Sequence, residues 1–273
     1  MAYKHLLVHV DTSRRAPERL ELAAALARRF GARLTGLFAE LASFGPSLVG
    51  RRSKEDLDRA AEAARAAFEA RAGAAGVQTQ WWPLEPGDYA QVVGSATVCC
   101  RYADLAVLGQ HDPEDARVPG DLVEQVLIGS GRPVLAVPWA GRFPDAGKRV
   151  VVAWNGTAEA ARALNDALPF MRDAEAVTVL GIQKPPVGEG RALPSLDIVA
   201  HLAAHGVAAH YERTFVEVGA IDFADILLNR AFDLGADLAV MGGHAHAAVG
   251  ALHASPNTRK VLTSMTMPVL VSR

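Results

Sequence analysis

Three histidines near the C-terminal end of the chain could bind a metal ion. His244 and His246 follow the pair Gly242-Gly243, and His253 comes shortly after them. Imidazole nitrogens are common zinc ligands in tetrahedral sites. No cysteine or carboxylate occurs in the same segment, and histidines in such loops are commonly solvated. We therefore expect a solvated loop here and keep a metal-dependent enzyme as the most distant alternative.

Carboxylates gather at the matching place in the first half of the chain. Asp11 ends an apolar run, and Asp112, Glu114 and Asp115 follow Gly109. Neighbouring acids repel a polyphosphate, so we expect this half to bind phosphate only with a bridging metal. No Ser-His-Asp arrangement, Walker lysine motif or Cys-x-x-Cys is present. The sequence favours binding or scaffolding without catalysis.

Composition excludes several classes of protein. The 28 Lys and Arg nearly balance 30 Asp and Glu, so no strong field attracts nucleic acid or an anionic membrane. No apolar run approaches the roughly 18 residues of a membrane span, and the N-terminal run is too short for a signal peptide. Cys99 and Cys100 are adjacent and poorly placed to bridge each other. We expect a cytoplasmic protein with reduced core thiols.

The elements that must position these residues occur twice. The block from Asp104 to Gly109 returns as Asp237 to Gly242, and residues 4–13 return as residues 148–157. Uninterrupted apolar runs of this length are typical of strands buried on both faces of a parallel sheet. A Pro/Gly-rich segment separates the copies. We predict a duplicated chain with domains at 1–141 and 142–273.

Each half alternates strand and helix patterns, which predicts two α/β domains. Each would hold a five-stranded parallel sheet of flavodoxin-like order with helices on both faces. In the first half we expect strands at 4–10, 33–39, 78–84, 105–108 and 133–137, and helices at 14–30, 53–72, 88–102 and 121–128. In the second half we expect strands at 148–154, 176–182, 208–216, 238–241 and 268–271, and helices at 158–171, 195–205, 222–234 and before the last strand.

Ligands of such sheets bind outside the carboxyl ends of the strands, where strand order reverses. Two crevices are therefore expected, one between Asp11 and the Gly109 turn and one between Asn155 and the Gly242 turn. Trp154 is a candidate wall of the second crevice. For Trp81 and Trp82, alternation along a strand predicts one ring in the core and the other against the adjoining half.

The sequence resembles the universal stress protein family, in particular its tandem two-domain members. The residues that carry the resemblance are Val10-Asp-Thr-Ser13, Trp154-Asn-Gly-Thr157, Asp237-Leu-Ala-Val-Met-Gly-Gly243 and Met267-Pro-Val-Leu-Val271. The resemblance covers nearly the whole chain and implies a stress-response protein. Nucleotide-binding members hold ATP with Gly-x-x-Gly, nine residues, then Gly followed by Ser or Thr, where backbone amides at a helix N-terminus cradle phosphate.

The resemblance implies a crevice in each half, and the second is the better preserved. Its expected residues are Asn155, Gly156, Thr157, Met241, Gly242, Gly243, His244, Ser255, Asn257 and Thr258, against Asp11 and Gly109 in the first half. Ala245 replaces the second glycine, and Ser255-Pro256 replaces the Gly-Ser pair. Pro256 lacks an amide, and Ser255 as an N-cap would itself occupy amides that phosphate needs. We expect any ATP or related adenine nucleotide in the second half; a protein-interaction scaffold without a ligand is the alternative.

The fifth strand of each half is apolar and would lie at a sheet edge. A bare apolar edge invites pairing with another strand. We therefore expect 133–137 and 268–271 to pair within the chain, which gives an intrachain pseudo-dimer. A homodimer through another surface stays open, and the sequence does not identify the small molecule or protein that binds.

Overall fold

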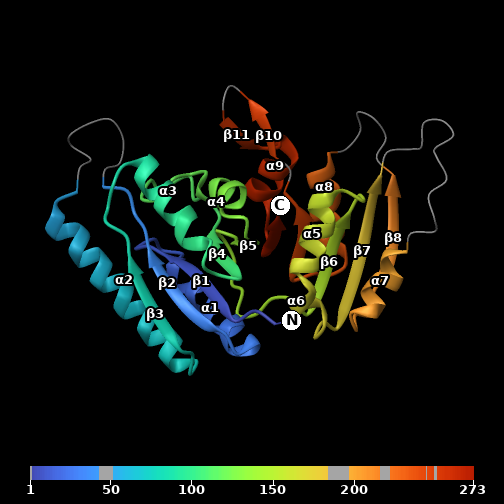
Figure 1. Ribbon diagram of the computed structural model, residues 1–273, viewed down its shortest axis with the longest axis horizontal. Coiled ribbons are helices and arrows are strands. Elements are labelled where there is room, and N and C mark those ends of the chain that lie inside the picture. Colours follow the sequence, from blue (N-terminus) through green and yellow to red (C-terminus); the bar gives the residue numbers. More distant parts are fainter. Residues whose placement is uncertain (1, 43–51, 184–196, 216–221, 244, 249–250) are drawn as a thin grey trace.

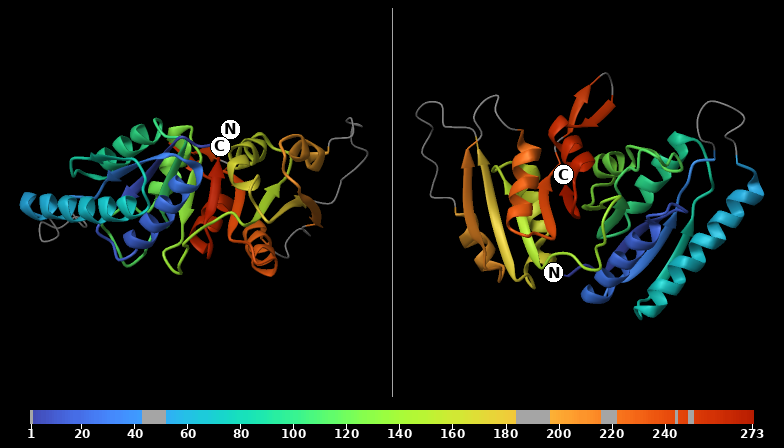
Figure 2. Two further views of the ribbon diagram at one scale, coloured as in Figure 1. Left: turned by 90° about the horizontal axis from the view of Figure 1, so that it is seen from below. Right: turned by 180° about the vertical axis from the view of Figure 1, so that it is seen from behind.

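The computed structural model describes residues 2–42, 52–183, 197–215, 222–243, 245–248 and 251–273 (Figure 1). Its two α/β halves lie side by side, with the last strand of each at the middle of the molecule. Both termini lie near this junction (Figure 2). None of the helices in the described ranges combines the length and the hydropathy of a membrane span.

The first half follows the predicted order of elements closely. Its strands are β1 (His5–Val10), β2 (Arg33–Phe38), β3 (Thr79–Pro83), β4 (Leu105–Gly109) and β5 (Val134–Val137). Its helices are α1 (Ala16–Phe30), α2 (Lys54–Ala74), α3 (Tyr89–Cys100) and α4 (Leu122–Ser130). Gly31 ends α1 in the left-handed conformation, with φ of 60°, as its position in the sequence predicts.

The second half repeats this order with additions. Its main strands are β6 (Arg149–Trp154), β7 (Ala176–Gln183), β8 (His210–Phe215), β9 (Leu238–Gly242) and β12 (Val269–Ser272). Its helices are α5 (Ala158–Asp166), α6 (Leu168–Met171), α7 (Ile198–Ala204), α8 (Phe223–Asp233) and α9 (Pro256–Ser264). The single helix predicted over 158–171 is wrong: Pro169 lacks an amide and cannot continue a helix, so α6 begins anew there.

The ten main strands form one continuous sheet in the order β3-β2-β1-β4-β5-β12-β9-β6-β7-β8. Pairing is parallel within each half, and only β5 and β12 run antiparallel. The predicted pairing of the two terminal strands is therefore confirmed. The two separate sheets that we expected are merged, because the backbone hydrogen bonds between β5 and β12 cross the junction.

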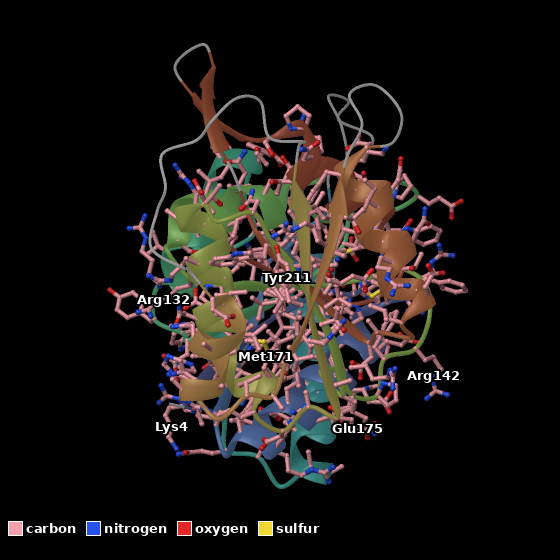
Figure 3. All side chains as sticks on the ribbon, turned by 90° about the vertical axis from the view of Figure 1, so that its right-hand side faces the viewer. Lys4, Arg132, Arg142, Met171, Glu175 and Tyr211 are labelled. Carbon is pink, nitrogen blue, oxygen red and sulfur yellow. The ribbon has the colours of Figure 1, made fainter. Side chains whose placement is uncertain are left out.

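Apolar residues of both halves fill the space on each face of the sheet (Figure 3). On one face Leu135 and Leu270 lie in the same cluster as Leu6 and Val150, all fully buried. Tyr3 and Phe30 meet Phe170 of the second half through edge-to-face ring contacts at 5.1 to 5.8 Å. The junction is therefore part of the core.

Two expectations about single segments are wrong. The stretch after Gly243 contains a two-stranded hairpin, β10 (Ala245–Ala248) and β11 (Ala251–Ala254), where we expected a loop. Trp81 packs on Phe38 and Phe68 as a core residue, but Trp82 does not touch the second half. Strand β3 lies at the outer edge of the sheet, far from the junction, so Trp82 lines a hollow within the first half.

Candidate functional site

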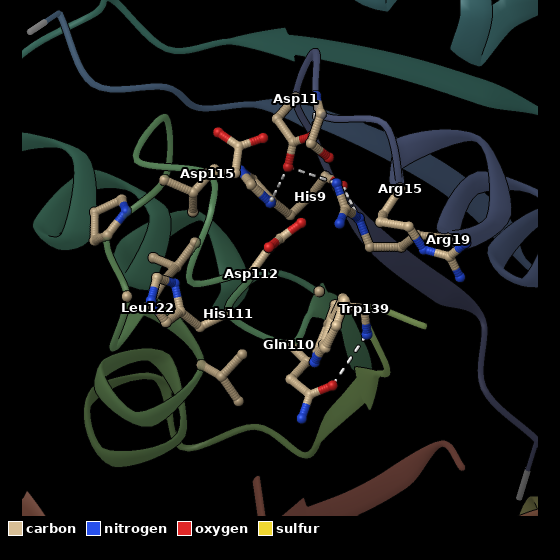
Figure 4. Close-up of a pocket in the computed structure, with 16 residues that line it drawn as sticks. His9, Asp11, Arg15, Arg19, Gln110, His111, Asp112, Asp115, Leu122 and Trp139 are labelled. Atoms are coloured by element: carbon tan, nitrogen blue, oxygen red, sulfur yellow. Dashed lines mark hydrogen bonds and ion pairs between the residues drawn. The ribbon is translucent and has the colours of Figure 1, made fainter. Parts of the chain in front are cut away.

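The crevice of the first half lies where β1 and β4 end, and Arg19 of α1 fills it (Figure 4). Its Nη2 donates to Asp11 Oδ2 at 2.7 Å, and its Nε donates to the His9 carbonyl at 2.8 Å. A Cβ at Gly109 would lie 2.2 Å from Arg19 Nη1. Glycine is therefore needed at position 109 because the Arg19 guanidinium lies against it.

The pair Asp11–Arg19 is buried and charged. Burial alone would raise the pKa of Asp11, but Arg19, His9 and hydrogen bonds from Ser13 outweigh it and lower that pKa to about 2. Burial is the main cause that lowers the pKa of His9. His9 Nε2 lies 2.8 Å from the Ala39 carbonyl, which can only accept, so the neutral ring carries its proton on Nε2. Asp11 is thus neutralised by Arg19.

The outer acids of this crevice also have cationic partners. Arg14 lies 3.3 Å from Asp112 and 3.4 Å from Glu114, and Arg117 lies 2.9 Å from Asp115. These cations reduce the repulsion that the sequence predicts for a polyphosphate at this place. That prediction left out Arg14, Arg15 and Arg19, which lie in the segment after Asp11. The remaining pocket has a volume of about 40 Å³, room for a few water molecules.

In the second half, Asn155 serves the turn into α5. Its Oδ1 accepts from Thr157 N at 3.2 Å and from Thr157 Oγ1 at 2.9 Å. Thr157 Oγ1 in turn accepts from Ala160 N as the N-cap of α5. Gly156 has a φ of 75°, which favours glycine. Asn155, directly after β6, is thus hydrogen-bonded to Thr157, the N-cap residue of α5.

Packing requires the two glycines at the end of β9, Gly242 in the strand and Gly243 directly after it. A Cβ on Gly242 would lie 2.6 Å from Ala160 N, against the first turn of α5. A Cβ on Gly243 would lie 2.7 Å from Leu127 Cδ2 of α4. Met241 before them is buried. The bend after β9 therefore lies beside the C-terminal end of β6, as predicted. Protein atoms, however, contact both glycines of this bend.

The N-terminus of α9 is capped from within. Ser255 Oγ accepts from Thr258 N at 3.2 Å, with Pro256 in the first helical turn, as the sequence predicts. Thr258 is buried and Asn257 is exposed. Nearby charges are also paired. Arg259 bonds Glu124 of the first half at 3.1 Å, and Lys260 lies 2.8 Å from Asp225 and 3.2 Å from Asp222.

The histidine segment is placed only in part. His246 and His253 are register partners in the hairpin β10–β11, and His244 lies outside the described residues. Among the side chains that the structure describes, no group of three or more could hold a metal ion. Trp154 packs against the hydrophobic core.

Gln110, which the sequence did not single out, links the two halves. Its Nε2 donates to the carbonyls of Leu262 at 2.9 Å and Thr263 at 3.0 Å, and its Oε1 accepts from Trp139 N at 3.0 Å. Helix C-termini have carbonyls without intrahelical partners. Gln110 therefore caps α9 across the junction from the position next to Gly109.

Comparison with known proteins shows the fold of the chain and a family match for its second domain. The universal stress protein family matches residues 147–273. No curated protein matches the chain. A universal stress protein from Archaeoglobus fulgidus covers 98% of this chain and 98% of its own, with a TM-score of 0.71 and 16% identity. A putative universal stress protein from Pseudomonas aeruginosa covers 99% and 93%, with a TM-score of 0.61 and 19% identity.

Shorter structures match about half of the chain. One of them, a universal stress protein from Archaeoglobus fulgidus in complex with dAMP, covers 50% of this chain at 23% identity with a TM-score of 0.36. The two full-length matches, at 16% and 19% identity, establish the fold. Residues 147–273 thus match the universal stress protein family by sequence, and the chain over its full length shares the two-domain fold of the two solved structures that cover it.

Proposed function

We propose that this protein is a non-catalytic stress-response protein that acts by binding, and that its strand-end crevices serve folding. The pair Asp11–Arg19 carries the proposal. In the first domain this buried pair already neutralises the acid that a nucleotide would use, and its guanidinium lies against the glycine turn. No catalytic arrangement stands in the sequence, which favours regulation or scaffolding over turnover.

A second candidate function is the binding of an adenine nucleotide in the second domain. One observation favours it over the first domain: among the described residues, Asn155 has no arginine or lysine against it. Asn257 is exposed in the first turn of α9, where a phosphate would meet helix amides. Against this candidate, Pro256 supplies no amide and Ser255 already accepts from one.

Isothermal titration of the full chain with AMP and ATP, each with and without Mg²⁺, tests both candidates. The closed-crevice proposal expects no heat from either nucleotide. Heat that is lost in Asp11→Asn would overturn it. Heat that is lost in Asn257→Glu, which places a negative charge beside a bound phosphate, but kept in the exposed control Asn229→Glu would establish the second candidate.

Zn²⁺ alone provides the remaining arm of the experiment. Heat from Zn²⁺ that disappears in His246→Ala would support the metal alternative suggested by the histidine segment. The variant Asn229→Glu again serves as the control, because this exposed position on α8 lies outside that segment.

A further inference from the structure

The first domain carries a hollow of about 500 Å³ that is separate from the strand-end crevice. It lies beside the C-terminal half of α3 and over the starts of β1 and β2, at the opposite end of the strands from Asp11. Its lining residues include His5, Arg33, Gln80, Trp82, Val98 and Tyr102. Pockets for small molecules have volumes of roughly 300 to 1,000 Å³, so the hollow is large enough for a ring system.

Arg33 is an exposed cation that forms no ion pair with an acid within the described part of the chain. Among the described residues, its side chain hydrogen-bonds the ring of His5, where Arg33 Nη2 donates to Nδ1 at 3.3 Å. His5 Nε2 lies 2.7 Å from Thr35 Oγ1. Asp104, the acid close to His5, accepts instead from the backbone amides of Lys4 and His5 at 2.8 and 3.0 Å.

His5 orients this cation in its neutral form. Arginine has only donors, so the bond from Arg33 needs an unprotonated Nδ1, and Nε2–H then donates to Thr35. Burial, followed by the charge of Arg33, lowers the pKa of His5, and this outweighs the Tyr102 carbonyl and Asp104. The hydrogen bonds from Arg33 to His5 and from His5 to Thr35 therefore orient the guanidinium and leave its positive charge uncompensated by either residue.

The walls of the hollow are aromatic and apolar. Trp82 meets the His5 ring edge to face with the ring centroids 6.1 Å apart. Tyr102 is 71% exposed and Val98 is 47% exposed, both on the helix side of the hollow. Large apolar side chains beside an unneutralised cation suit a ligand that has both a flat ring and a negative charge.

The second domain shows that the fold does not require this hollow. The strand registers place Ala176 at the position of Arg33, because each pairs with the first residue of its domain's first strand. By the same registers Glu212 stands where Trp82 stands. Glu212 accepts two hydrogen bonds from Arg230 of α8, at 2.7 and 2.8 Å. In the second domain an ion pair therefore links β8 to α8 at this place. In the first domain the same place is a hollow lined by Trp82 and Arg33.

We propose that this hollow binds a small planar aromatic anion, with its ring against Trp82 and Tyr102 and its anionic group on Arg33. This site is independent of the proposed closure of the strand-end crevices. It would give the protein a small-molecule ligand of its own.

Calorimetric titration of the full chain with three naphthalene probes tests the proposal. The probes are 2-naphthoate, 2-naphthyl phosphate and neutral 2-naphthol, and we expect at least one anion to bind at least tenfold more tightly than the neutral probe. Preference between the two anions distinguishes a carboxylate from a phosphate ligand. In Arg33→Gln the anion should lose about tenfold or more in affinity, because a hydrogen bond to a charged group is lost. Arg33→Lys should lose less.

Two further variants separate a binding role from a structural one. Trp82→Glu introduces the residue that stands at this position in the second domain, and it should abolish binding of the anion. Arg230→Gln, the matched loss of an arginine from the Glu212–Arg230 pair of the second domain, should leave the affinity unchanged. The proposal is overturned if neither anion binds, if neutral 2-naphthol binds as tightly, or if Arg33→Gln binds like the unchanged protein. A concentration-dependent dimer in sedimentation that Trp82→Glu abolishes would also overturn it, since the face would then be an interface between copies.

Discussion

The guanidinium of Arg19 meets the carboxylate of Asp11 at 2.7 Å, with both side chains almost fully buried beside Gly109. The carboxylate of Asp11 compensates the charge of the buried Arg19 guanidinium. That guanidinium in turn occupies the space that a side chain at position 109 would need. At the place where the sequence resemblance predicts a nucleotide site, Asp11 forms an internal ion pair and Gly109 leaves room for the arginine of that pair.

Removal of Arg19 should destabilise the protein strongly. Arg19→Met leaves the Asp11 carboxylate buried without its cation, which costs about 3 to 5 kcal/mol. Urea denaturation at pH 7 measures this change in the free energy of unfolding. Arg14→Met is the matched control, because Arg14 has a side chain 60% exposed and forms only surface ion pairs, worth about 0 to 1 kcal/mol. Equal effects of the two variants would contradict our assignment.

Stability should fall in acid through Asp11. The pKa of Asp11 is lowered in the folded protein from 3.8 to about 2, so its contribution is present above the unfolded pKa and is lost as pH falls from about 4 through about 2. The loss is of order 2 kcal/mol. Urea midpoints between pH 6 and pH 2 measure it, and Asp11→Asn should lack this part of the pH dependence. A variant with the same slope would show that another group is responsible.

Much of the fold follows from local sequence patterns, because apolar runs, caps and glycine stops act over short distances. The two halves, the helices that begin at Ser53 and Asp88, and the pairing of β5 with β12 all followed from the sequence. The hairpin β10–β11 was not, since alanine and histidine show no strand alternation. Trp82 was placed wrongly because alternation gives the face of a strand and not its neighbour.

The candidate sites were less predictable than the fold. Arg19 and Asp11 are eight residues apart, so the pair was visible in outline, but only coordinates place the guanidinium against Gly109. Gln110 caps a helix more than 150 residues later in the chain. Contacts of this kind depend on how the two halves pack against each other. The local periodicity of apolar residues in the sequence does not specify that packing.

The β5–β12 junction should be essential for stability. Leu135 and Leu270 are register partners across it, and neither is exposed. Each Leu→Ala change should cost about 2 to 5 kcal/mol, and the double variant should show a coupling energy of about 0.5 to 3 kcal/mol. Leu270→Lys should prevent folding. If Leu270→Lys is as stable as Thr263→Lys, an exposed control on α9, the junction is not buried.

Loss of Gln110 should weaken the contact between the halves. Gln110→Ala leaves the carbonyls of Leu262 and Thr263 without their donor at a site where Gln110 is 9% exposed. The expected cost is about 1 to 3 kcal/mol in urea denaturation. Gln125→Ala, which removes a bond to Asp121 on the same helix turn, should cost less. A larger loss in Gln125→Ala would show that Gln110 does not cap α9.

The two cysteines should differ in reactivity although they are adjacent. Burial, with a smaller effect of Cys99, raises the pKa of the Cys100 thiol to about 12, and Cys100 is not exposed at all. At pH 8 its thiolate fraction is on the order of 10⁻⁴. Burial also raises the pKa of Cys99, but that side chain is only partly buried and reaches the hollow beside Trp82. Reaction with a chromogenic disulfide should therefore modify at most one thiol in the native protein, slowly, and two after unfolding in guanidinium.

The two serine variants show which cysteine reacts. Cys99→Ser should abolish the reaction of the native protein, and Cys100→Ser should preserve it. The reverse pattern would show that Cys99, and not Cys100, lies in the core. Because Cys99 lines the hollow, a bound aromatic anion should also slow its labelling, while the rate in Arg33→Gln at the same anion concentration should stay close to that without ligand.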